Sequence, residues 1–170
     1  MRLPFLRKVT TGDEPLVVSM TGARLGDTVV FAGQSASLVL PLAARTGLSG
    51  RCLVVGPREA TAPLEATATR EGLLVEVADS FPTDRASELA VVEAVGEWAI
   101  ATAGLRDAVR GGGRIVVVAG SPRKGLLARL SARPAEVAPE VIVQTLSAQG
   151  WKRARSVGER DGLVFVEAFG

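Results

Sequence analysis

Two acidic residues, Glu93 and Glu97, are the side chains best placed in this sequence for acid–base chemistry. They follow an apolar run over residues 87–92 that favours a buried strand. Ligands of open α/β sheets bind beyond the carboxyl ends of the strands, so one of these carboxylates could act as a base. Both also suit solvated positions at the start of a helix, where negative charge is favoured. We therefore assign no catalytic residue.

The amino-acid composition limits the catalytic, metal-binding and nucleic-acid-binding functions that this chain could have. The chain has no histidine and no tyrosine, which removes the commonest metal ligand and the commonest general base. Cys52 is the only cysteine, so no internal disulfide can form, and we expect no metal site. Its apolar neighbours favour a buried core thiol. A net charge of +2 and 4% aromatic residues disfavour nucleic-acid binding.

The small polar stretch from Gly33 to Ser37 follows another apolar run and has the composition of a strand-to-helix turn. Ser35 and Ser37 could cradle an anion there, because the first N–H groups of a helix have no partner within the helix. They also suit ordinary capping of the helix start, which serine strongly favours. Trp98 and Trp151 suit either a pocket wall or the core.

Apolar runs alternate with helical patterns along the chain. Strands are predicted over 28–32, 51–55, 73–77, 87–92, 114–118, 152–157 and 163–169, and helices over 13–22, 38–44, 59–71, 97–109 and from 139 to before 150. Glycines 111–113 are expected to end the fourth helix. Strand–helix alternation predicts a parallel α/β sheet, and the short turn 158–162 predicts a closing antiparallel hairpin. We expect an N-terminal extension over 1–14 and a single domain over 15–170.

Two segments combine basic and apolar residues, 1–8 and 121–134. Each could bind a protein partner or rest on an anionic membrane surface, and each could also be a solvated surface segment. No apolar run approaches the roughly 20 residues that span a bilayer. The first residues lack the apolar core of a secretory signal, so we expect a cytoplasmic protein.

Four local sequences resemble class I methyltransferases that depend on S-adenosylmethionine (SAM), and most closely the small-molecule type related to ubiquinone and menaquinone biosynthesis enzymes. They are "LGDTVV" at 25–30, "VEVAD" at 75–79, "LRDAVRGGGRIVVV" at 105–118 and the tail "SAQGWKRARSVGERDGLVFVEAFG" at 147–170. The resemblance implies a three-layer Rossmann-like fold with a mostly parallel seven-stranded sheet and a C-terminal antiparallel hairpin.

The resemblance also implies where the cofactor would bind. The family's first motif, acid-x-G-x-G-x-G, corresponds here to residues 31–37, where Phe31 replaces the acid and only the first glycine remains. The ribose-binding acid of the family corresponds to Gly56, and Asp79 corresponds to the residue that contacts the adenine amine. The cofactor-binding candidates are Gly33, Gln34, Ser35, Gly56, Asp79, Ser80 and Glu93.

These departures predict that SAM binding is lost or reduced. Loss of a charge-assisted pair of hydrogen bonds to the ribose should cost roughly 2–4 kcal/mol. One hypothesis is therefore a methyltransferase-like accessory or scaffold subunit. A second is an active small-molecule methyltransferase with a diverged cofactor site. A nicotinamide-dependent dehydrogenase fits less well, because "GQSAS" at 33–37 departs from G-x-G-x-x-G.

Overall fold

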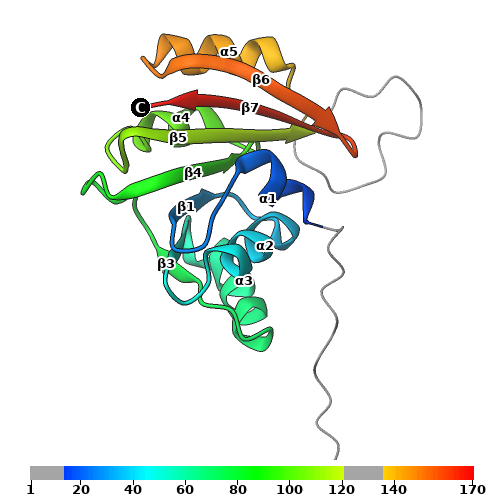
Figure 1. The fold of residues 1–170 in the computed structure, drawn as a ribbon, viewed down its shortest axis with the longest axis vertical. Coiled ribbons are helices and arrows are strands. Elements are labelled where there is room, and N and C mark those ends of the chain that lie inside the picture. The colour runs from blue at the N-terminus through cyan, green and yellow to red at the C-terminus, as the bar shows by residue number, and fades with distance from the viewer. Residues whose placement is uncertain (1–13, 121–135) are drawn as a thin grey trace, which may run out of the picture.

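The computed structural model describes residues 14–120 and 136–170, which form one sheet with helices packed on it (Figure 1). The two basic-apolar segments, 1–8 and 121–134, lie outside the described residues. Within the described part of the chain, no helix is both long and apolar enough to cross a membrane.

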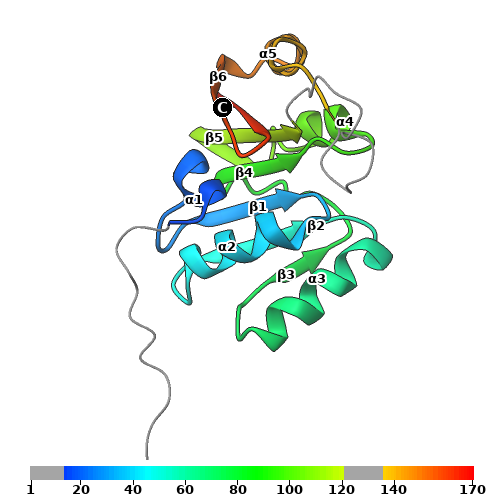
Figure 2. The same ribbon diagram turned by 90° about the vertical axis from the view of Figure 1, so that its right-hand side faces the viewer.

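Seven strands form a single mixed sheet in the order β3-β2-β1-β4-β5-β7-β6. They are β1 (Thr28–Ala32), β2 (Arg51–Val55), β3 (Glu76–Ala78), β4 (Ser87–Glu93), β5 (Val109–Gly120), β6 (Lys152–Arg160) and β7 (Leu163–Phe169). The first five strands pair in parallel, and β7 pairs antiparallel with both β5 and β6. This arrangement confirms the predicted α/β fold with its C-terminal hairpin. β3 and β6 lie at opposite ends of the sheet (Figure 2).

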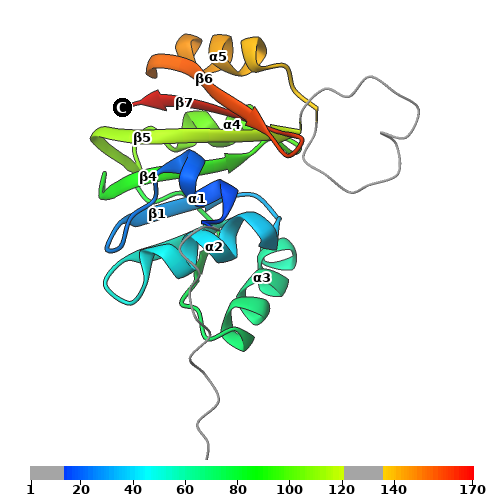
Figure 3. The same cartoon turned by 45° about the vertical axis from the view of Figure 1, so that its right-hand side comes forward.

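Five helices cover the two faces of the sheet. They are α1 (Leu16–Thr21), α2 (Ala36–Thr46), α3 (Arg58–Arg70), α4 (Trp98–Gly104) and α5 (Pro139–Ala148). Buried residues of α1, α2 and α3 share one apolar cluster with the sheet. Buried residues of α5 share the other cluster, against which partly buried residues of α4 pack. Figure 3 shows α1 and α2 in front of the strands and α4 behind them. The molecule therefore has the predicted three layers.

Strand β1 illustrates why these runs form central strands. Its side chains alternate between the two faces, so that Val29 and Phe31 pack toward α2 while Val30 and Ala32 pack on the other side. A strand buried on both faces needs a continuous apolar sequence rather than an alternating one. The run 28–32 provides that sequence, and four of its five residues are buried.

The third strand is displaced from its predicted position. β3 covers Glu76–Ala78 rather than 73–77, because the backbone N–H of Leu73 still bonds to the carbonyl of Ala68 at the end of α3. Pairing with β2 begins only at Glu76, opposite Leu53. The apolar run at 73–77 thus covers the connection between α3 and β3 as well as the first residues of β3.

The predicted fourth helix is also too long, and the prediction that glycines 111–113 end it is wrong. α4 ends at Gly104, and β5 begins at Val109 and runs through the three glycines. Ser87 pairs with Val109 while Leu89 pairs with Arg114, so the glycines form a bulge in β5. Gly112 has φ +75°, a conformation that glycine adopts readily.

Candidate functional site

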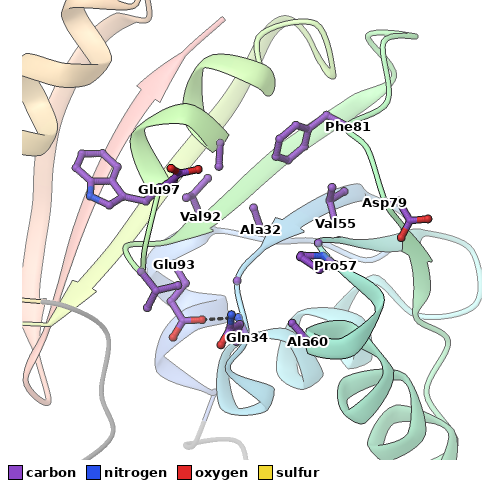
Figure 4. Close-up of a pocket in the computed structure, with 15 residues that line it drawn as sticks. Ala32, Gln34, Val55, Pro57, Ala60, Asp79, Phe81, Val92, Glu93 and Glu97 are labelled. Carbon is purple, nitrogen blue, oxygen red and sulfur yellow. Dashed lines mark hydrogen bonds between the residues drawn. The ribbon is translucent and has the colours of Figure 1, made fainter.

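A cavity of about 260 Å³ opens at the carboxyl ends of β1, β2 and β4 (Figure 4). This is the edge at which ligands of open α/β sheets bind. Its lining comes from these strand ends and from the starts of α3 and α4: Ala32, Gly33, Gln34, Val55, Gly56, Pro57, Ala60, Asp79, Phe81, Val92, Glu93, Val95, Glu97, Trp98 and Ala101.

Five of the seven predicted cofactor-binding residues line this cavity: Gly33, Gln34, Gly56, Asp79 and Glu93. The other two do not. Ser80 is exposed beyond β3, and Ser35 turns its hydroxyl to Glu93. Sequence positions far apart in the chain therefore meet at one edge of the sheet, as their positions after successive strands predicted.

Glu93 is not a solvated acid at a helix start, and that interpretation is wrong. It is the last residue of β4, is 3% exposed, and reaches across to the loop between β1 and α2. Its Oε2 accepts hydrogen bonds from the backbone N–H groups of Gln34 (2.7 Å) and Ser35 (3.0 Å). Its Oε1 accepts one from the Ser35 hydroxyl. Figure 4 shows Glu93 turned toward Gln34.

Ser35 occupies the N-cap position of α2, but it does not cap the helix with its side chain. Its hydroxyl bonds to Glu93 instead. The carboxylate of Glu93, 58 residues further along the chain than Ser35, satisfies the N–H groups of Gln34 and Ser35 in the loop that leads into α2. Ser37 lies exposed in the first turn of α2.

The two glycines of the cavity differ in the space around them. A Cβ on Gly33 would lie 2.6 Å from the Cβ of Glu93 and 2.8 Å from Cζ of Phe31. A Cβ on Gly56 would meet only Cγ2 of Thr61, at 3.3 Å. Gly33 is thus required by the packing of Glu93, whereas a side chain at Gly56 needs only a small adjustment.

Phe31, at the position of the family's first acid, does not fill the cavity. Its side chain is fully buried among residues of β1, α2 and their neighbours on the opposite face of the sheet. The apolar residue at this position therefore belongs to the core, and the cavity remains open.

Aromatic and acidic side chains form the rest of the wall. Phe81 and Trp98 supply aromatic surface, and Asp79 and Glu97 are exposed at the rim. Phe81 was missed by the sequence analysis, although its position two residues after Asp79 is a usable signal. Of the two roles expected for Trp151, a pocket wall or the core, the structure shows the core. The residue is 3% exposed and its indole N–H donates to the carbonyl of Thr102 at 3.2 Å.

The residues present fit SAM only in part. Asp79 is available, but Gly56 offers no ribose acceptor and the N–H groups of Gln34 and Ser35 already bond to Glu93. Among residues 14–120 and 136–170 there is no group of three or more side chains that could hold a metal ion.

Solved structures of SAM-dependent methyltransferases share this fold. A SAM-dependent methyltransferase from Aquifex aeolicus has a TM-score of 0.74 at 19% identity, covering 92% of this chain and 88% of its own. A SAM-dependent O-methyltransferase from Thermotoga maritima has a TM-score of 0.63 at 15% identity, covering 90% and 62%. Human N-acetylserotonin methyltransferase in complex with SAM has a TM-score of 0.64 at 14% identity, covering 90% and 50%.

The chain thus spans most of the Aquifex protein but about half to two thirds of the other two. At these identities the similarity establishes the methyltransferase fold. No protein-family model matches the sequence, and no curated protein matches it either.

Proposed function

We propose that this chain is a cytoplasmic methyltransferase-fold protein with lost or reduced SAM binding, which acts as an accessory or scaffold subunit. The proposal depends above all on the Glu93 contact. This buried carboxylate bonds to the loop N–H groups of Gln34 and Ser35, at the site where the fold would present donors to a ligand. Gly56 adds a second loss, because it supplies no acceptor for a ribose.

Calorimetry with SAM and with S-adenosylhomocysteine tests the proposal directly. We expect neither to bind with micromolar affinity, because an incoming carboxylate must compete with Glu93 for the same donors. Micromolar binding of either compound by the wild-type chain would contradict the proposal.

Restoring the missing acid gives a sharper test. The variant Gly56→Asp should strengthen SAM binding by about 30-fold or more, since it adds charge-assisted hydrogen bonds to the ribose. The open space at this position, with only Thr61 nearby, should accept the side chain. Gly56→Asn is the matched control, with similar size and no charge, and should gain much less. Equal gains in both variants would show that the carboxylate is not the missing group.

The open cavity favours a second candidate, an active SAM-dependent methyltransferase with a diverged site. Phe31 packs in the core, so the space between Gly33, Gly56 and Asp79 is not filled. The resemblance to quinone-biosynthesis enzymes then favours an apolar, quinone-like acceptor. Transfer of a radiolabelled methyl group from SAM to such an acceptor would support this candidate, and its absence would support the accessory role.

The basic-apolar segments 1–8 and 121–134 are the surfaces that we propose for a protein partner. Their composition also suits peripheral binding to anionic lipid. Flotation of the purified chain with phosphatidylglycerol vesicles distinguishes protein binding from lipid binding. If the segments bind a protein partner, we expect no recovery of the chain with the vesicles.

A further inference from the structure

A second cavity, also of about 260 Å³, lies on the opposite side of the sheet, where the parallel strands begin. β4 and β5 start on this side, and β7 ends there (Figure 1). Three arginines line the cavity, Arg24 before β1 and Arg110 and Arg114 in β5, together with the acids Asp27 and Glu88. It shares no lining residue with the candidate cofactor cavity.

The glycine bulge of β5 brings two of these arginines to one cavity. In a regular strand, residues four positions apart are about 13 Å from each other. Here glycines 111–113 loop out between Arg110 and Arg114, and both arginines line the same space. A Cβ on Gly112 would have no atom within 4 Å beyond its chain neighbours, so there is room beside the bulge for a ligand.

Arg114 is held in place at the wall of this cavity. Its Nη1 donates to Oε2 of Glu167 at 3.2 Å, and its side chain is 28% exposed. Its Nη2 lies against Gly22, where an added Cβ would be only 2.5 Å away. Gly22 has φ +64°, so glycine is favoured there by its backbone as well as by this contact. Arg114 therefore supplies a positive charge at a fixed position.

The other two arginines have N–H donors available to a ligand. Nη1 of Arg110 is 3.7 Å from Oε1 of Glu88, which is too long for a hydrogen bond. Among residues 14–120 and 136–170, no carboxylate forms an ion pair with the guanidinium group of Arg24. An arginine carries several N–H donors in a planar fork, which matches the oxygen atoms of a phosphate.

The two acids of the cavity accept hydrogen bonds from the backbone. Oδ2 of Asp27 accepts one from the N–H of Arg24 at 2.8 Å, and Oε2 of Glu88 accepts one from the N–H of Thr28 at 2.7 Å. These contacts hold the loop that leads into β1. With three arginines and two acids, the lining keeps a positive charge.

We propose that this cavity binds the phosphoryl group of a small soluble molecule. Arg24 and Arg110 donate hydrogen bonds to its oxygen atoms, and Arg114 adds a fixed charge beside them. Two arginine forks suit a group that carries nearly two negative charges better than they suit a single carboxylate. The proposal does not depend on SAM binding, because the two cavities are separate.

Glycerol 3-phosphate, glycerate and glycerol test the ligand class, since they share a carbon skeleton and differ in charge. In calorimetry at low salt we expect glycerol 3-phosphate to bind with a Kd of about 1 mM or tighter, and glycerate about tenfold more weakly or not at all. Glycerol should not bind. Absence of glycerol 3-phosphate binding, or equal binding of glycerate, would overturn the proposal.

Nuclear magnetic resonance of the ¹⁵N-labelled chain locates the bound phosphate. Glycerol 3-phosphate should shift the amide signals of Gly112 and Gly113, which line the cavity. Shifts at Gly33 and Gln34 without shifts in the bulge would place the phosphate in the other cavity and would overturn the proposal.

Three glutamine variants assign the binding to particular arginines. Arg24→Gln and Arg110→Gln should each weaken glycerol 3-phosphate binding by about tenfold, because each removes charge-assisted hydrogen bonds. Arg85→Gln is the matched control, an exposed arginine before β4 that does not line the cavity, and it should change the Kd by less than about twofold. Similar losses in all three variants would indicate attraction by the general surface charge and would contradict the proposal.

Glu88→Gln should have the opposite effect. It removes a negative charge from the cavity and keeps an oxygen that can accept from Thr28, so glycerol 3-phosphate should bind about threefold more tightly or better. Damage to the fold cannot produce such a gain, so this variant remains informative if an arginine variant does not fold. Unchanged or weaker binding in a folded Glu88→Gln chain would count against the proposal.

A phosphate of the same chemistry also occurs on membrane lipids. Flotation with phosphatidic acid vesicles distinguishes the two sources: recovery that is lost in Arg24→Gln, without binding of glycerol 3-phosphate, would overturn the proposal of a soluble ligand. Calorimetry with SAM addresses the other cavity. Micromolar SAM binding therefore contradicts the accessory role alone, and absence of phosphate binding contradicts this inference alone.

Discussion

Gly33 shows how one residue can be fixed by its neighbours rather than by its own backbone. Its φ lies outside the left-handed region, but the side chains of Glu93 and Phe31 approach from two directions. We expect Gly33→Ala to lower the free energy of unfolding by about 1–3 kcal/mol, because the added methyl group overpacks this contact.

Urea unfolding measures this effect, and Gly56→Ala is the control. The added methyl group there meets only Thr61 at 3.3 Å, so its effect should stay within about 0.5 kcal/mol of wild type, as for a tolerated small substitution. If Gly33→Ala lowered the free energy of unfolding as little as Gly56→Ala does, Glu93 would be able to move aside.

Cys52 should make the stability of the protein fall in alkaline solution. Burial, and secondarily the charge of Glu76, raise the pKa of the thiol from 9.0 to about 12. Below pH 9 the thiol is protonated in both folded and unfolded chains. Between pH 9 and 12 only the unfolded chain ionises, so the free energy of unfolding should fall by up to about 1.4 kcal/mol per pH unit.

Urea unfolding at pH 8 and pH 10.5 checks this expectation against Cys52→Ala, which should be less stable at both values but should lack this part of the decline. The same burial should keep the thiol unreactive toward a disulfide reagent at pH 8 until denaturant is added. Rapid reaction in the folded chain would contradict the assigned environment.

At the residue scale, the sequence located much of the candidate site but not its internal contacts. Gly33, Gly56 and Asp79 follow successive apolar runs, so topology alone brings them to one edge of the sheet. The bond between Glu93 and the loop could not be predicted, since it joins groups 58 and 59 positions apart through side-chain reach. No local pattern distinguishes such a buried acid from a solvated one.

An ion network joins the three C-terminal strands of the sheet. Glu167 on β7 has a side chain that is 5% exposed and lies 3.2 Å from Nη1 of Arg114 on β5 and 2.7 Å from Nη2 of Arg155 on β6. We expect Glu167→Ala to lower the free energy of unfolding by about 3 kcal/mol, because Arg114, which is 28% exposed, loses its partner.

Arg155→Ala is the matched variant for thermal or urea unfolding. The Arg155 side chain is 72% exposed, so its removal should cost about 1 kcal/mol or less. If the two variants lost equal free energy of unfolding, the stability provided by this network would come from the exposed ion pair with Arg155 rather than from the pairing of the buried carboxylate with Arg114.

The type and order of the elements could be predicted better than their ends. Long apolar runs specify β1, β2 and β4, since each must be buried on both faces. The bulge in β5 could not be predicted from glycines 111–113, because three glycines suit a helix end as well as a strand irregularity. Pairing with β4 decides between the two.

For the whole molecule, we expect one cooperative unfolding transition, because all described strands belong to one sheet. The two tryptophans report on different places: Trp98 lines the cavity and Trp151 lies between α5 and β6. In each of the variants Trp98→Phe and Trp151→Phe, the fluorescence of the remaining tryptophan should therefore give the same urea midpoint as far-UV circular dichroism of that variant. Separate midpoints would contradict the prediction of a single domain over 15–170.

The two ends of the sheet limit the ways in which copies of this chain can pair with one another. An open edge invites strand addition and aggregation unless it is short or charged. β3 has only three residues, which gives another strand little to pair with. β6 is long but exposes Lys152, Arg153, Arg155 and Arg160, so a second copy of this edge would meet like charge. Length at one edge and charge at the other thus protect the molecule against edge-to-edge fibril growth.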